Sequence, residues 1–234
     1  ALAGFVLFPD GRVSDVQRRQ MTTVDAPNVH AIAVDGTFDD CQDLVKAMFN
    51  DVQFRMARNL SAVNSINWAR VMAQIVYYVF AATRLGGPQR PVSFAVPTGN
   101  FGDIFAGYAA MKMGLPVEKL IVATNVNDIL ARTLETGRYE KRGVTPTISP
   151  SMDIQVSSNF ERLLFELCED AEKVRSWTED LTSRGIFEVE GELLSLIREE
   201  FIGESVSNED CLTTIRRVHD ESGYLIDPHT AVAW

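Results

Sequence analysis

One short segment of the sequence, Pro97–Asp103, has the residue types and spacing to bind an anion. It reads Pro-Thr-Gly-Asn-Phe-Gly-Asp, follows the apolar run Val92–Val96 and precedes a helical pattern. Glycines allow close backbone approach and positive φ, so successive N–H groups can point into one concavity. A helix start adds unpaired N–H donors and the positive end of the helix dipole. The segment therefore predicts an anion site that a phosphate monoester would fit.

The same residues also allow a purely structural interpretation. In that case Pro97–Asp103 is an ordinary turn between a strand and a helix, and Asp103 is the helix cap. The spacing matches neither G-x-x-x-x-G-K-[ST] nor G-x-G-x-x-G, so it does not indicate ATP or a dinucleotide. The pattern alone leaves both interpretations open.

The composition excludes several function classes. A formal net charge of -10 argues against nucleic acid, since no basic surface would neutralise phosphates. The longest apolar stretch, Val71–Ala82, is too short and too polar to span a membrane. The three cysteines and three histidines lack the spacing of a disulfide framework or a zinc site. We expect a cytoplasmic protein, and the first residues, which lack a charged n-region, do not resemble a signal peptide.

The elements that position Pro97–Asp103 follow from apolar patterning. Strands are predicted at 4–8, 29–34, 92–96 and 120–123, and helices at 14–21, 39–56, 61–85, 103–113 and 127–135. In the helix over 61–85, one face is marked by Ile66, Ala69, Ala73, Val76 and Phe80. Residues 138–157 are loop-like, and helical patterns near 158–168, 170–184, 189–201 and 208–221 follow. This alternation predicts an α/β fold with a parallel sheet, flanking helices and a mostly helical C-terminal half.

Five blocks of the sequence together resemble the threonine synthase family. They are GRVSDVQRRQMTT, NSINWARVMAQIVYYVF, VPTGNFGDIFAGYAAMKMGLPVEKLIVATNVNDIL, SPSMDIQVSSNFERLLFELC and DPHTAV, in this order between Gly11 and Val232. The resemblance implies a partial tryptophan synthase β-like architecture, which is fold type II of the pyridoxal-phosphate (PLP) enzymes. It also implies a PLP-dependent lyase that converts O-phospho-L-homoserine and water to L-threonine and phosphate, the last step of threonine biosynthesis.

The resemblance assigns cofactor-binding roles to two segments. The amides of Gly99, Asn100, Phe101 and Gly102 are expected to hold the PLP phosphate. Asp103 is acidic, so we expect it to cap the helix or to contribute only its N–H. Thr230, in Asp227-Pro228-His229-Thr230, matches the residue near the pyridine nitrogen, although the sequence alone favours a first-turn helix residue there.

Other polar residues carry weaker expectations. Asn67 and Arg70 lie three residues apart on one predicted helix face, and Arg suits the substrate's phosphate. A salt bridge or a packing role is an equal alternative for that pair. The structural interpretation is a helix cap for Asn125, Asn127 and the segment 157–159, and a hydrogen-bonding role for His229.

The resemblance also indicates what these residues lack. The family's Schiff-base lysine matches none of Lys46, Lys112, Lys119, Lys141 and Lys173, and we expect it upstream of Ala1, in an absent N-terminal domain. Residues 1–234 are thus predicted to be a single fragment of the catalytic core, inactive alone. Residues 88–137 form the βα units of the phosphate loop, and 158–234 form the helical part. The alternatives are a threonine synthase-like phospholyase or dehydratase, or a non-catalytic phosphate-binding module. The oligomeric state stays open.

Overall fold

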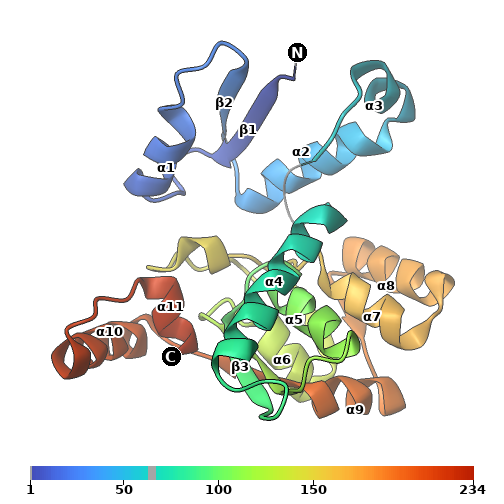
Figure 1. Ribbon diagram of the computed structural model, residues 1–234. Coiled ribbons are helices and arrows are strands. Elements are labelled where there is room, and N and C mark those ends of the chain that lie inside the picture. Colours follow the sequence, from blue (N-terminus) through green and yellow to red (C-terminus); the bar gives the residue numbers. More distant parts are fainter. Residues whose placement is uncertain (1, 63–66) are drawn as a thin grey trace. The chain divides into compact units, whose positions relative to one another are not determined.

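The computed structural model describes residues 2–62 and 67–234 (Figure 1). The chain divides into two compact units, Ala1–Ala62 and Val63–Trp234. The sequence shows no linker composition near this boundary. Each unit has its own sheet, and the anion-binding segment belongs to the second.

The first unit contains a two-stranded parallel sheet. Strand β1 (Gly4–Pro9) pairs with β2 (Val29–Val34) from Gly4 opposite Val29 to Pro9 opposite Val34, as the apolar runs predict. Its helices are α1 (Asp15–Thr22), α2 (Phe38–Asn50) and α3 (Val52–Arg58). The single helix predicted over 39–56 is wrong, because Asp51 adopts an extended conformation and caps α3. The cap of α2 is Thr37, with Asp40 as its capping-box partner.

The second unit is built on a three-stranded parallel sheet. Its order is β3 (Val92–Pro97), β4 (Val117–Thr124) and β7 (Phe201–Ser205). Helices α4 (Trp68–Arg84), α5 (Gly102–Lys112) and α6 (Ile129–Thr136) lie around it. Helix α5 packs on α4 and β4, and α6 packs on β4 and β7. The predicted parallel sheet is confirmed, and β7, which the helical patterns did not predict, is its third strand.

The remaining elements surround this sheet. A short antiparallel pair joins β5 (Arg138–Glu140), in the segment predicted to be loop-like, to β6 (Ile186–Glu188), in the gap between two predicted helices. One 3-10 turn, η1, spans Pro150–Met152. The C-terminal helices are α7 (Phe160–Cys168), α8 (Ala171–Ser183), α9 (Gly191–Glu200), α10 (Asn208–Ser222) and α11 (Pro228–Ala233), so the mostly helical half is confirmed.

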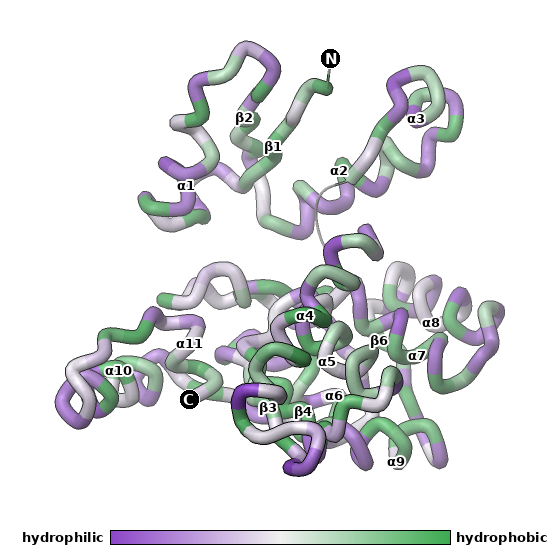
Figure 2. The backbone as a smooth tube through the Cα atoms, viewed as in Figure 1, coloured by the Kyte–Doolittle hydropathy of each residue, from purple (hydrophilic) through white to green (hydrophobic). Residues whose placement is uncertain are grey.

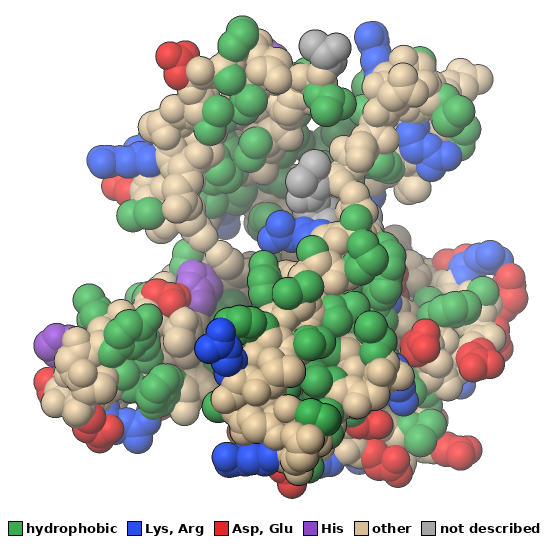
Figure 3. Space-filling view, viewed as in Figure 1, with side chains coloured by type: hydrophobic (Ala, Val, Ile, Leu, Met, Phe, Trp, Pro, Cys, Tyr) green, Lys and Arg blue, Asp and Glu red, His purple; other side chains and the backbone are tan. Residues whose placement is uncertain are grey.

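The buried face of α4 is not the one that the apolar pattern marks. Val71, Tyr78 and Ala82 are buried, whereas Val76 and Phe80, on the marked face, are 62% and 58% exposed. Figure 2 shows hydrophobic residues along α4 and α5, and Figure 3 shows hydrophobic side chains gathered over α4. The spacing of apolar residues could not show which face of α4 is buried, because this helix is apolar on two sides. Exposed apolar faces of this kind are typical of contact surfaces. Ile66 lies outside the described residues.

The core of the second unit brings the anion-binding segment against distant elements. Phe101 is 2% exposed, and its ring lies 5.3 Å from the ring of Phe160 and 5.6 Å from that of Phe201. Burying an aromatic side chain of this size stabilises the fold by about 2–3 kcal/mol. Phe101 therefore fixes the start of α5 against α7 and β7. No helix within the described residues is long and apolar enough to cross a membrane.

Candidate functional site

The candidate site lies where the parallel strands end. β3, β4 and β7 end at Pro97, Thr124 and Ser205, and parallel strands present their carboxyl ends at one edge of the sheet. In open α/β sheets ligands bind at this edge. The segment Thr98–Phe101, which we call the loop, leaves β3 at this edge and leads into α5.

The backbone of the loop ends in a left-handed residue directly before a helix. The Thr98 amide donates to the Ala123 carbonyl across 2.8 Å, which continues the sheet pairing for one residue. Phe101 then adopts the left-handed conformation, with φ 63° and ψ 0°, immediately before helical Gly102. Successive amides in left-handed and right-handed conformations form a nest for anions. A positive φ is uncommon for an aromatic residue, and the burial of Phe101 holds it there.

The helix α5 begins without a side-chain cap. Its N-cap residue is Phe101, and no side-chain oxygen accepts from the first turn. The first N–H groups of a helix have no intrahelical acceptor, so the amides of Gly102, Asp103 and Ile104 stay available to an external anion. The predicted capping role of Asp103 is therefore wrong, because the helix begins one residue earlier and the Asp103 side chain bonds elsewhere.

The segment Ser157–Asn159 fixes the orientation of two loop peptides. The Gly99 carbonyl accepts from Ser157 Oγ. The Asn100 carbonyl accepts from the Asn159 amide at 3.1 Å and from Asn159 Nδ2 at 3.0 Å. In a planar trans peptide the carbonyl and the following N–H point in opposite directions. The amides of Asn100 and Phe101 are therefore turned away from 157–159. Asn159 is the N-cap residue of α7, as expected for this segment, but its side chain does not accept from the first turn of that helix.

The turn η1 lies against the loop on one side and against α11 on the other. A Cβ atom at Gly99 would lie 2.9 Å from the Ser151 carbonyl oxygen, so the two segments are in backbone contact. The Ser151 amide donates to His229 Nε2 at 3.2 Å. Thus η1 links Gly99 to the residue before Thr230, and the structure brings the two predicted cofactor segments to the same turn.

The side chain of Asp103 is directed to α4. Tyr78 Oη donates to the Asp103 carbonyl at 2.9 Å and lies 3.2 Å from Asp103 Oδ1. Burial raises the pKa of Asp103, and the hydrogen bond from Tyr78 and the charge of Arg70 offset this only in part. Because its side chain bonds Tyr78 on α4, the Asp103 carboxyl is held by that helix and does not cap α5.

Asp227 organises the start of α11. It accepts from the His229 amide at 2.9 Å and from Thr230 Oγ1 at 2.5 Å. Partial burial acts to raise the pKa of Asp227, but the bonds from Thr230 and His229 lower it overall. Since His229 Nε2 accepts from Ser151, its Nδ1 is the donor, 3.2 Å from Asp227. His229 is thus a structural hydrogen-bonder, as expected, and Thr230 is an exposed first-turn residue.

The asparagines after β4 hold the neighbouring loop instead of capping a helix. Asn125 Nδ2 donates to Asp153 Oδ1 at 2.9 Å, and Asn127 Nδ2 donates to the same oxygen at 3.1 Å. Asp153 also accepts from the amide and hydroxyl of Thr147 at 2.8 and 2.7 Å. This buried network fixes residues 145–153, which include η1. The N-cap residue of α6 is Asp128, so the predicted caps are wrong.

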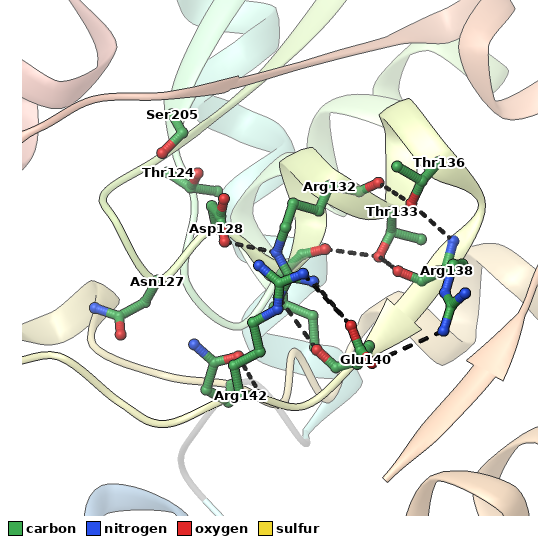
Figure 4. A network of polar contacts seen from close by, with 12 residues as sticks. Thr124, Asn127, Asp128, Arg132, Thr133, Thr136, Arg138, Glu140, Arg142 and Ser205 are labelled. Carbon is green, nitrogen blue, oxygen red and sulfur yellow. Dashed lines mark hydrogen bonds and ion pairs between the residues drawn. The ribbon is translucent and has the colours of Figure 1, made fainter.

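Figure 4 shows a second polar network on α6. Arg132, whose side chain is 13% exposed, pairs with Asp128 at 2.7 Å and donates to the Glu140 carbonyl at 3.1 Å. These bonds tie α6 to β5. Since they join secondary-structure elements to each other, we assign them to the scaffold.

The other residues considered in the sequence are two polar residues at the start of α4 and the lysines. Asn67 is the N-cap of α4 and accepts from the Ala69 amide at 3.0 Å, so it does not lie on a helix face with Arg70. Arg70 is exposed and acts electrostatically on Asp103. Lys112 is at the far end of α5, about 15 Å along the helix axis from the loop. Lys119 bonds the Glu199 carbonyl, and Lys173 lies 5.1 Å from the ring of Trp177.

This geometry fits a phosphate monoester. The loop has a nest at Phe101, two peptides turned by hydrogen bonds, and an uncapped eleven-residue helix behind it. Gly99 has no room for a side chain on the η1 side. The PLP phosphate is an anion of this type, so the residues present are compatible with it.

Comparison with known proteins identifies relatives. The threonine synthase of Pseudomonas aeruginosa is 55% identical over 229 residues, which cover 97% of this chain and 49% of that protein. A PLP-bound threonine synthase structure from Brucella melitensis has 59% identity and a TM-score of 0.87, covering 98% of this chain and 50% of that one. The yeast threonine synthase structure is 47% identical with a TM-score of 0.85, and the match covers 99% of this chain and 48% of that one.

These similarities confirm the predicted fold, which is that of the solved threonine synthases. The chain spans about half the length of these relatives. A family model described as "Pyridoxal-phosphate dependent enzyme" matches residues 2–181. The chain therefore belongs to the pyridoxal-phosphate dependent enzyme family.

Proposed function

We propose that the protein containing this chain is a threonine synthase, which converts O-phospho-L-homoserine and water to L-threonine and phosphate with PLP as cofactor. The observation that carries the proposal is the loop geometry, with two peptides oriented by Ser157 and Asn159 at the start of uncapped α5. The 55% identity to a threonine synthase supports the specific reaction.

The loop would bind and orient the cofactor. PLP supplies an electron sink for carbanions at the substrate carbon atoms. The amides of Gly99, Asn100, Phe101 and Gly102 would hold its phosphate, and the amide of Asp103 lies in the same helix turn. Thr230 would lie beside the pyridine nitrogen. Because its hydroxyl donates to Asp227, it would offer the ring its oxygen lone pairs.

Arg70 is the candidate for the substrate's phosphate. Its guanidinium is exposed at the start of α4, and its charge acts on Asp103 in the first turn of α5. A planar guanidinium binds phosphate through two parallel hydrogen bonds. Asn67 uses its side-chain oxygen to cap α4, so we propose for it a role in placing Arg70.

A lysine that holds the cofactor covalently would come from outside these residues. Lys112 lies at the far end of α5, 5.0 Å from the ring of Tyr108, and Lys119 bonds the Glu199 carbonyl. We therefore propose that residues 1–234 are part of a catalytic core, with the loop in βα units 88–137. We also propose that the complete protein works in the cytoplasm. Its partner would be the small-molecule substrate.

The test uses the complete gene product with PLP and O-phospho-L-homoserine. A threonine synthase releases phosphate and forms an equal amount of L-threonine. A phospholyase or dehydratase of the same fold would release phosphate together with ammonia and a keto acid and would form no L-threonine, and a non-catalytic module would release nothing. Phosphate release without threonine, or no release, would contradict the proposal.

A further inference from the structure

We propose that Ser157 and Asn159 are positioning residues of the phosphate-binding loop, which set its affinity for the PLP phosphate without touching the cofactor. This inference rests on the proposed cofactor role of the loop. It starts from the two carbonyls that these residues hold, those of Gly99 and Asn100.

Both side chains are buried and have defined partners. Ser157 is 3% exposed and Asn159 is 1% exposed. The Ser157 amide donates to Tyr139 Oη at 2.7 Å, so the main chain is fixed beside the hydroxyl that binds Gly99. Asn159 Oδ1 accepts from Arg162 Nε at 2.9 Å. That bond determines the orientation of the amide group, so that Nδ2 faces the Asn100 carbonyl.

The contacts control the direction of two donors. If the Asn100 carbonyl lost its partners, the peptide between Asn100 and Phe101 could rotate about the adjacent φ and ψ angles. The Phe101 amide would then leave the concavity. If the Gly99 carbonyl lost Ser157, the peptide between Gly99 and Asn100 could rotate in the same way, and the Asn100 amide would leave the concavity. A site whose donors are held before the ligand arrives binds more tightly, because less conformational entropy is lost on binding.

The position in the sequence agrees with this role. Residues 157–159 lie 58 and 59 positions from the carbonyls that they bind, so folding of α7 against α5 is needed to assemble the anion site. Phe160, the next residue, packs its ring on Phe101 at 5.3 Å. The same short segment thus fixes both the peptides of the loop and the left-handed residue at its end.

The test compares binding of PLP and pyridoxal, which lacks the phosphate, to the complete gene product. The variants are Asn159→Ala, which removes the Nδ2 donor without adding a charge near the phosphate, and Ser157→Ala. The control is Ser195→Ala, which also removes a hydroxyl that donates to a main-chain carbonyl, on α9. The melting temperature of each apoprotein reports folding.

We expect each site variant to reduce the preference for PLP over pyridoxal by about tenfold, and the control to leave it unchanged. Equal losses for both ligands would show a structural role only and would overturn the inference, as would an unchanged preference. If the unsubstituted protein itself bound both ligands equally well, the proposed cofactor role of the loop would fail instead.

Discussion

Replacement of Gly99 by alanine should weaken cofactor binding through a steric contact in the backbone. The new Cβ atom would lie 2.9 Å from the Ser151 carbonyl oxygen. Unstrained contacts between heavy atoms need about 3.5 Å, so η1 or the loop must move by roughly half an ångström. Overpacking of this size costs about 1–3 kcal/mol. If that cost falls on the loop conformation that binds phosphate, the Kd for PLP rises about tenfold or more.

The assay is a titration of the apoprotein with PLP, followed by the absorption of the bound cofactor. Gly143→Ala is the matched control, because a Cβ atom there meets nothing within 4 Å and the backbone has no positive φ. Because the Ser151 amide bonds His229, the displacement should also reach the start of α11. If Gly99→Ala bound PLP as tightly as the parent and melted at the same temperature, the assigned contact between the loop and η1 would be refuted.

Three further predictions concern stability. Gly203→Ala should lower the free energy of unfolding by about 1–3 kcal/mol in a denaturant titration, because a Cβ atom there lies 2.8 Å from the Ala131 Cα atom. Burial raises the pKa of Asp103, so the free energy of unfolding of the parent falls as pH rises from about 4 through that pKa. Asp103→Asn should flatten this part of the plot of unfolding free energy against pH. Asp227 has a lowered pKa, so its stabilisation is present above about pH 4 and is lost as pH falls through the folded pKa. Asp227→Ala should therefore cost about 1 kcal/mol at pH 7 and little in acid.

The elements around the loop could be predicted because their signals are local. The run Val92–Val96 and the glycines after it indicated a strand, a turn and a helix start, which the structure confirms. Strand β7 could not be predicted in this way. Its five residues follow α9 directly and include Gly203, so only their pairing with β4 makes them a strand. The core face of α4 was missed because its neighbours, not its period, determine which side is buried.

The contacts that orient the loop also could not be predicted from the sequence. Ser157 and Asn159 precede a helix, where such residues usually cap, yet they bind carbonyls almost sixty residues away. Asp103 likewise bonds Tyr78, on a different helix. Side chains that can satisfy local or distant partners equally well are assigned by tertiary structure. The loop was therefore predictable as a turn between a strand and a helix, but the residues that hold its peptides were not.

The most direct test is a crystal structure of the complete gene product with PLP bound. We expect the cofactor phosphate to lie within about 2.7–3.2 Å of the amides of Gly99, Asn100, Phe101 and Gly102. We also expect the Gly99 and Asn100 carbonyls to keep their bonds to Ser157 and Asn159. A cofactor phosphate held elsewhere, with the loop amides facing solvent, would contradict the central claim.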